Sequence, residues 1–163
     1  MSKLYVDEIR PKTSGKHVLM PEKPVFFALG TASGYQACAT SNTVITEWST
    51  SGTGYFSHGG LTHSSGVVTV PVAGIYEVTG SILTDIDNGE YVLLMIYQNS
   101  DRITLSQMYN ESSGGNMKHT ATTHAFLNCA SGDEITLRQQ GGNTSTRWYN
   151  NSTYGTFGVR LVG

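Results

Sequence analysis

The sequence is poor in charged residues. Asp, Glu, Lys and Arg make up 13% of its 163 residues, against roughly 25% in ordinary soluble proteins. The formal net charge is −2, and no basic stripe is present that could displace counterions from phosphates, so we expect no nucleic-acid binding. The chain also lacks the apolar run of about 18 residues that a membrane-spanning helix needs. A surface with so few charges must be covered by small polar residues or buried against other subunits.

Cysteine is scarce as well. Cys38 and Cys129 are the two cysteines of the chain, which is too few for a disulfide framework. Both stand among small apolar residues, so we expect buried free thiols, with a single bridge as the alternative. The segment Met1–Glu8 lacks the apolar core of a secretory signal. We therefore interpret the Asn-x-Ser/Thr triplets as polar loops rather than glycosylation sites.

Helix signals are nearly absent, whereas strand signals recur along the chain. No window of a dozen residues keeps the helical spacing of apolar positions, and glycine occurs 19 times. Runs of β-branched and aromatic residues alternate with clusters of Gly, Asn, Asp and Ser. The predicted strands are Val25–Leu29, Thr43–Trp48, Val67–Val70, Gly74–Leu83, Tyr91–Gln98, Ile103–Met108, Thr120–Cys129, Glu134–Arg138 and Tyr154–Val162. Short strands without intervening helices predict an all-β sandwich or barrel.

Alternation within the strands predicts which side chains face the core. Tyr76, Val78, Gly80 and Ile82 share one face of their strand, with polar residues between them. The run Tyr91–Tyr97 is different, because it is apolar on both faces. In an antiparallel sandwich only one face of a strand meets the core, so we expect the other face to contact a second subunit.

Several segments resemble, in order, the motifs of the complement C1q head and tumour necrosis factor (TNF) superfamily. The segment Thr62–Val78 is similar to the signature of that family. It contains a turn followed by Val68, Val70, Pro71, Gly74 and Tyr76. Lys23–Leu29, Glu90–Asn99, the predicted hairpin Leu127–Leu137 and the closing strand Tyr154–Leu161 are similar to further family segments. Departures are Val68 for the usual Phe, Val78 and Gly80 at two aromatic positions, and the lack of a collagen repeat.

The resemblance implies a jelly-roll β-sandwich of two antiparallel sheets over residues 25–163, assembled as a homotrimer. In that family the inner sheet packs around the threefold axis. We therefore expect three strands, Val25–Leu29, Tyr91–Tyr97 and Tyr154–Leu161, to form the trimer interface. The interface side chains predicted on these strands are Phe26, Leu94, Ile96, Phe157 and Val159. Without a collagen repeat, we do not expect a secreted complement-type protein.

Residues 1–24 differ in composition from the rest of the chain. They hold five of the ten Lys and Arg residues and three of the four prolines. We interpret them as an extended arm that becomes ordered on a partner, with a frayed terminus as the alternative. The segment Leu4–Gly15 resembles the short N-terminal peptide of phage virion fibres and decoration proteins. That resemblance implies a location in the virion, and anchoring of the arm to other virion proteins through Leu4, Val6, Ile9 and Arg10.

Candidate metal ligands are few. Asp85, Asp87 and Glu90 offer the oxygen donors that calcium prefers, but their stretch is too short for a 12-residue EF-hand loop. Asp-Asn-Gly is also ordinary turn chemistry, which we favour here. His119 and His124 are five apart on a predicted strand and therefore face opposite sides. We expect no cofactor and no resident metal, with calcium at the three acidic residues as the alternative.

Nothing in the sequence favours catalysis. The nucleophile elbow G-x-S-x-G is absent, and the scattered acidic residues are weak candidates for glycoside cleavage. The loops around Tyr109, Trp148 and Tyr149 combine aromatic and amide side chains, which suit recognition of a glycan or a host protein. Packing of Trp148 and Tyr149 within the subunit is the alternative. We therefore expect a virion structural protein, with a carbohydrate- or receptor-binding module for host recognition as the second hypothesis.

Overall fold

The computed structural model describes residues 23–112 and 114–163. Within these ranges the chain forms thirteen strands and no helix. No helix in this part of the chain is therefore long and apolar enough to cross a membrane. The anchoring residues Leu4, Val6, Ile9 and Arg10, and almost all of the predicted arm, lie outside the described residues.

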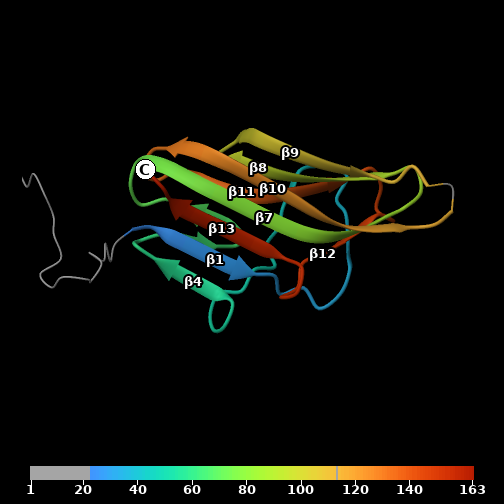
Figure 1. Cartoon of the computed structure of the whole chain (residues 1–163), viewed down its shortest axis with the longest axis horizontal. Coiled ribbons are helices and arrows are strands. Elements are labelled where there is room, and N and C mark those ends of the chain that lie inside the picture. Colours follow the sequence, from blue (N-terminus) through green and yellow to red (C-terminus); the bar gives the residue numbers. More distant parts are fainter. Residues whose placement is uncertain (1–22, 113) are drawn as a thin grey trace, which may run out of the picture.

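One layer of the molecule is a seven-stranded antiparallel sheet (Figure 1). Across its middle the order is β10 (Met117–Cys129), β7 (Gly74–Ile86), β13 (Thr156–Leu161), β1 (Val25–Leu29) and β4 (Tyr55–His58). At the far end of β7, β12 (Arg147–Tyr149) takes the place of β13 and pairs in turn with β2 (Gln36–Ala37). The long strands β7 and β10 therefore run the length of the sheet.

The second layer is a six-stranded antiparallel sheet. Its order is β5 (Thr62–Ser64), β6 (Val67–Thr69), β11 (Glu134–Gly141), β8 (Tyr91–Gln98) and β9 (Asp101–Tyr109), with β3 (Thr43–Val44) added at the end of β11. The all-β class and the sandwich of two antiparallel sheets are thus confirmed. The strand order is that of a jelly roll, since neighbours in the sheets are mostly distant in sequence.

The predicted hairpin Leu127–Leu137 is wrong in one respect. β10 pairs with β7 in one sheet, whereas β11 pairs with β6 and β8 in the other. The turn with Gly132 at φ 92° therefore carries the chain from one layer to the other. The local sequence indicates that the chain turns here, but it does not indicate which distant strand each of the two flanking strands pairs with.

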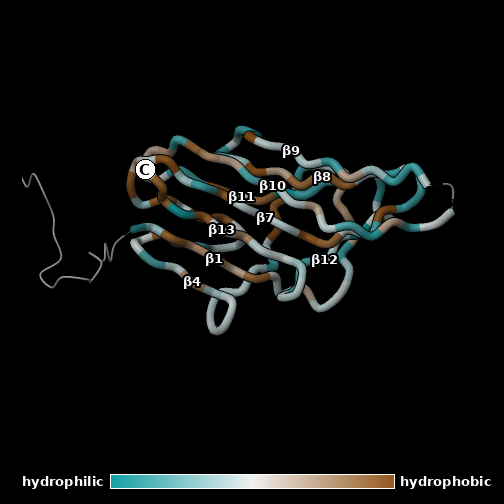
Figure 2. The backbone as a smooth tube through the Cα atoms, viewed as in Figure 1, coloured by the Kyte–Doolittle hydropathy of each residue, from teal (hydrophilic) through white to brown (hydrophobic). Residues whose placement is uncertain are grey.

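The core lies between the sheets and follows the alternation of each strand. Tyr76, Val78 and Ile82 are fully buried, as predicted, and Gly80 between them is buried too. Figure 2 shows hydrophobic positions distributed along the strands of both layers. Phe26, Trp48 and Phe157 form an aromatic group within the core, with Phe157 5.3 Å from Phe26 and 5.5 Å from Trp48 between ring centroids. Both cysteines are buried and free, as expected.

The strand β8 is buried on both faces within the single chain. Leu94 and Ile96 point into the core, while Met95 and Tyr97 on the other face are 0% and 6% exposed. The guanidinium of Arg138 lies 4.1 Å from the centroid of the Tyr97 ring, and the Tyr97 hydroxyl accepts a 2.6 Å hydrogen bond from an amide side chain of the loop before β3. The apolar run therefore does not require a second subunit to cover these side chains, which corrects the sequence-based inference.

Candidate functional site

The five side chains predicted for the trimer interface are core residues of the single chain. Phe26, Leu94, Ile96, Phe157 and Val159 are each at most 1% exposed, so they offer no surface to a neighbour. The physical reason is the strand period of two, which places these residues on the inner face and their chain neighbours on the outer face. In addition, β8 belongs to the six-stranded sheet, on the opposite layer from β1 and β13.

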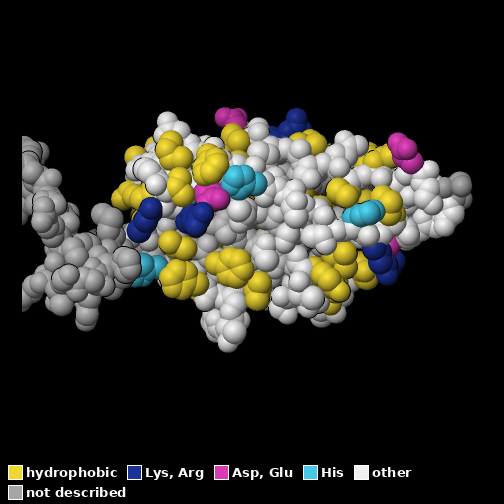
Figure 3. Space-filling view, in the orientation of Figure 1, with side chains coloured by type: hydrophobic (Ala, Val, Ile, Leu, Met, Phe, Trp, Pro, Cys, Tyr) yellow, Lys and Arg dark blue, Asp and Glu magenta, His cyan; other side chains and the backbone are white. Residues whose placement is uncertain are grey.

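The outer face of the seven-stranded sheet, which points away from the core, carries large exposed apolar side chains. Phe27 on β1 is 37% exposed, Phe56 on β4 is 51% exposed, and Phe126 on β10 is 61% exposed. Figure 3 shows this face, with hydrophobic side chains gathered over β1 and β4. Three exposed phenylalanines on one sheet face form an apolar surface of the kind that marks an interaction site. Sequence reasoning missed all three, although the alternation of Val25–Leu29 already separates Phe27 from Phe26.

The strand register arranges this face in two rows across the sheet. One row runs His124, Thr79, Gly158, Phe27 and Phe56, from β10 to β4. The adjacent row runs Phe126, Glu77, Arg160, Val25 and His58 over the same strands. Aromatic side chains therefore stand on both sides of the face, with small or polar residues in the middle.

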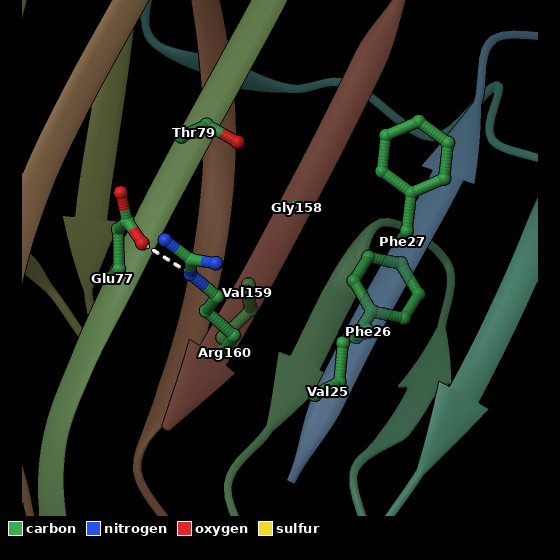
Figure 4. Close-up of a pocket in the computed structure, with 8 residues that line it drawn as sticks. All are labelled: Val25, Phe26, Phe27, Glu77, Thr79, Gly158, Val159 and Arg160. Carbon is green, nitrogen blue, oxygen red and sulfur yellow. Dashed lines mark hydrogen bonds and ion pairs between the residues drawn. The ribbon is translucent and has the colours of Figure 1, made fainter. Parts of the chain in front are cut away.

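We call the two raised parts the β1–β4 ridge and the β10 ridge. Phe27 and Phe56, adjacent in register, form the β1–β4 ridge. In the β10 ridge, the rings of His124 and Phe126 pack edge to face with centroids 5.0 Å apart. Between the ridges lies a groove of about 270 Å³, whose lining includes Phe27, Thr79 and Gly158. We call it the Gly158 groove, because Figure 4 shows no side chain at Gly158 between Thr79 and Phe27.

A charged cluster closes one end of the Gly158 groove. The Glu77 carboxylate accepts hydrogen bonds from Arg160 Nε and, at 3.2 Å, from the His124 ring when its Nε2 is protonated. The hydrogen bond from Arg160 is the main cause that holds the pKa of Glu77 below its usual value, against a smaller opposing effect of desolvation. The carboxylate is therefore ionised at neutral pH and is already paired within its own chain.

A second group of side chains lies on the same face, around β12. The Tyr35 ring lies 5.2 Å from that of Tyr149, and Tyr149 lies 6.0 Å from Tyr154. The cationic groups of Lys118 and Arg147 lie 5.5 Å and 5.1 Å from the Tyr35 ring centroid. We call this the Tyr35 cluster. Its aromatic rings and flanking cations combine contact area with polar groups, which suits ligand recognition.

The three acidic residues weighed as calcium ligands lie at the end of β7 and in the turn that follows it. Asp85 is 2% exposed, and one of its oxygens accepts a 2.6 Å hydrogen bond from Arg147. The Glu90 amide donates to the Asp87 carbonyl at 3.1 Å, within the turn that joins β7 to β8, where Gly89 has φ 72°. Among residues 23–112 and 114–163, no group of three or more metal-ligating His, Cys, Asp or Glu side chains comes together.

The predicted ligand-binding aromatics are not all at the surface. Trp148 is 4% exposed and belongs to the core, so its indole is not available to a ligand and that part of the prediction is wrong. Tyr149 is half-buried and joins the Tyr35 cluster. Tyr109 is 45% exposed but stands on β9 of the six-stranded sheet. The structure thus places Tyr109 and Tyr149 in different layers.

Comparison with known proteins agrees with this architecture. No family model matches the chain, and no curated protein does either. Among solved structures, the chain is similar to the Eiger TNF of S. frugiperda, with a TM-score of 0.67 over 87% of this chain and 94% of that one. The fold is TNF-like. At 14% sequence identity, the likeness concerns the fold alone, so the TNF part of the sequence resemblance is supported at the level of architecture.

The two surfaces differ in what they can do. The outer face around the Gly158 groove combines exposed aromatic side chains, a groove and one paired charge cluster, which suits contact with a protein surface. The Tyr35 cluster is more polar and carries exposed cations, which suits a smaller or more hydrophilic ligand.

Proposed function

We propose that this chain is a self-assembling structural subunit, whose outer face on the seven-stranded sheet forms the contacts of a homotrimer. The observation that carries the proposal is the exposure of Phe27, Phe56 and Phe126 together on that face. Full burial of such a side chain contributes on the order of 1.5–3 kcal/mol, so covering the exposed parts of all three would favour association through this face. The TNF-like fold supports a trimer in particular, because the C1q and TNF superfamily that the sequence resembles assembles as homotrimers.

We further propose that the trimer is a knob of a phage fibre or a decoration protein of the virion, attached through its N-terminal residues. Leu4, Val6 and Ile9 would add apolar contacts to a partner, and Arg10 would favour an acidic rim. Three arms acting together would turn weak individual contacts into firm attachment. The proposal assigns the chain no catalytic role, no cofactor and no resident metal.

Deletion of residues 1–20 tests the virion role. Since the described fold begins with β1 at Val25, the truncated chain should remain a folded trimer but fail to join particles. The paired substitution Val6→Asp and Ile9→Asp should have the same effect, whereas Thr13→Asp serves as a control on the same segment. Particle incorporation is measured by co-sedimentation with purified virions. Normal incorporation of the truncated chain would overturn the attachment role.

A second candidate function, recognition of a host glycan or protein, is favoured by the Tyr35 cluster. The cationic groups of Lys118 and Arg147 lie near the Tyr35 ring, and the Tyr149 ring packs against it. These contacts preorganise the aromatic surface. On a glycan array, binding that disappears in Tyr35→Ala but persists in Tyr109→Ala would support this function. Binding that is unchanged in Tyr35→Ala, or absent from the unaltered chain, would count against it.

A further inference from the structure

The Gly158 groove is large enough for an aromatic side chain. Its volume is about 270 Å³, and an apolar cavity of about 150 Å³ is large enough for benzene. Phe27 and Val25 provide apolar walls, and the polar end is formed by Glu77 and Arg160. Because Glu77 is already bonded by Arg160 and His124, covering this end does not leave an isolated carboxylate.

At the floor of the groove, Gly158 leaves room that a larger side chain would occupy, and its backbone conformation does not itself require glycine. Gly158 does not have the positive φ that favours glycine, and glycine within a strand often marks a site of close approach by another group. A Cβ atom at this position would lie 2.8 Å from Thr79 Oγ1 and 3.8 Å from Phe27 Cδ2. The methyl group of an alanine would therefore project into the groove, while rotation of the Thr79 side chain could relieve the closer contact.

The chain itself provides a side chain that matches the groove. Phe126 is the most exposed of the large apolar side chains in the described part of the chain, at 61%, and it does not line the groove. It stands on β10, two strands away from β13. At about 4.8 Å between neighbouring strands, this separation is about 10 Å. The register partner of Phe126, Glu77, lines the groove from the adjacent strand β7, but the Phe126 ring does not enter the groove of its own chain.

We propose that Phe126 of one subunit inserts into the Gly158 groove of a second copy of this chain. A closed ring of identical subunits needs two different, complementary patches on each subunit. The β10 ridge and the Gly158 groove are such a pair, since both lie on the outer face but at different strands. The inference rests on the proposed assembly through this face and adds the contact that sets its geometry. Aromatic side chains that are buried in a pocket of the partner commonly contribute much of the binding free energy of an interface.

Sedimentation velocity over a concentration series tests the contact. Phe126→Ser removes the inserted ring, Gly158→Ala places a methyl group in the groove, and Thr79→Leu fills the groove from its other wall. Each should raise the concentration at half-association about tenfold or more. Leu105→Ser is the matched control, because Leu105 is 43% exposed on the six-stranded sheet, and it should leave association unchanged. Thermal unfolding at low concentration confirms that each variant is folded.

Mixing two variants separates the contact from a folding defect. Phe126→Ser chains keep an intact groove and Gly158→Ala chains keep an intact ring, so a mixture should associate more strongly than either variant alone. If both variants assemble as the unaltered chain does, or if the mixture gains nothing, the inserted-ring contact is wrong while the assembly proposal stands. If the unaltered chain is monomeric at all concentrations, the assembly proposal itself fails.

Discussion

Phe26 and Phe157 pack edge to face in the core, with ring centroids 5.3 Å apart and planes at 76°. Their chain neighbours Phe27 and Gly158 lie opposite each other in register on the outer face. On each of these two strands, a residue that packs in the core is thus followed directly by a residue that lies on the outer face. Substitutions at the inner positions should affect folding, and those at the outer positions should affect assembly.

Leu94→Ala is expected to lower the free energy of unfolding by about 2–5 kcal/mol, because Leu94 is fully buried and the truncation leaves a cavity. Leu93→Ala, at the half-buried neighbour on the other side of β8, should cost clearly less. Urea unfolding followed by fluorescence measures both. Leu94→Asp should unfold the chain rather than give a folded monomer. A folded, monomeric Leu94→Asp variant would show that Leu94 belongs to an interface after all.

His63 should make the fold sensitive to mild acid. Its ring lies 4.9 Å from that of Phe26 and 6.4 Å from that of Tyr55. Neither ring nitrogen has a hydrogen-bond partner among the described residues. Burial lowers the pKa of His63 below its ordinary value near 6.5. The unfolded chain therefore binds the proton more readily, so stability should fall as pH drops below about 6.5.

His63→Leu removes this proton-binding group and keeps an apolar side chain against Phe26. The urea midpoint of the variant should change less between pH 7.5 and pH 5 than that of the unaltered chain. His119→Leu, an exposed histidine on β10, is the control and should retain the original pH dependence. If the urea midpoint changed equally with pH in the His63→Leu variant and in the unaltered chain, His63 would not be the source of the acid sensitivity.

The two thiols should be unreactive in the folded protein. Burial raises the pKa of Cys38 to about 12 and that of Cys129 to about 11, so almost no thiolate is present at pH 8. A chromogenic disulfide reagent should therefore label neither cysteine in native buffer and both in concentrated urea. Rapid labelling of either thiol in native buffer would contradict its buried position.

Glu77 should stabilise the folded state at neutral pH and lose this effect in acid. The hydrogen bond from Arg160, with that from His124, holds its pKa below the unfolded value, so the contribution is present above about pH 4.3 and disappears as pH falls through the lower folded pKa. Glu77→Gln should therefore lower the urea midpoint at pH 7 but change it little at pH 2.5. An equal effect at both pH values would show that the charge is not responsible.

Much of the fold was predictable from local sequence. The bounds of β1 and β8 agree with the predicted strands Val25–Leu29 and Tyr91–Gln98, because these apolar runs end at turn-forming residues. The inward face of β7 also followed from its period of two. In contrast, β4 at Tyr55–His58 was missed, since the glycines and serines around it resemble a loop and its pairing with β1 is distant in sequence.

The candidate site was less predictable, because it depends on pairing between strands that are distant in sequence. Alternation tells which residues share a face, but it does not tell which face meets the core or which sheet a strand joins. Phe26 rather than Phe27 was therefore assigned to the interface, and β8 was placed with β1 although it lies in the other layer. The Gly158 groove requires Thr79, Gly158 and Phe27 to be in register, which is set only by the assembled sheet.

The proposed homotrimer requires that this chain assembles through the outer face of its seven-stranded sheet. The most direct measurement is the mass of the unaltered protein in solution, by sedimentation equilibrium at micromolar concentration. A homotrimer has three times the 17.6 kDa of the single chain, and the Phe27→Ser and Phe56→Ser double variant should have a smaller mass. A mass of one chain for the unaltered protein, or a trimer that is indifferent to both substitutions, would contradict this proposal.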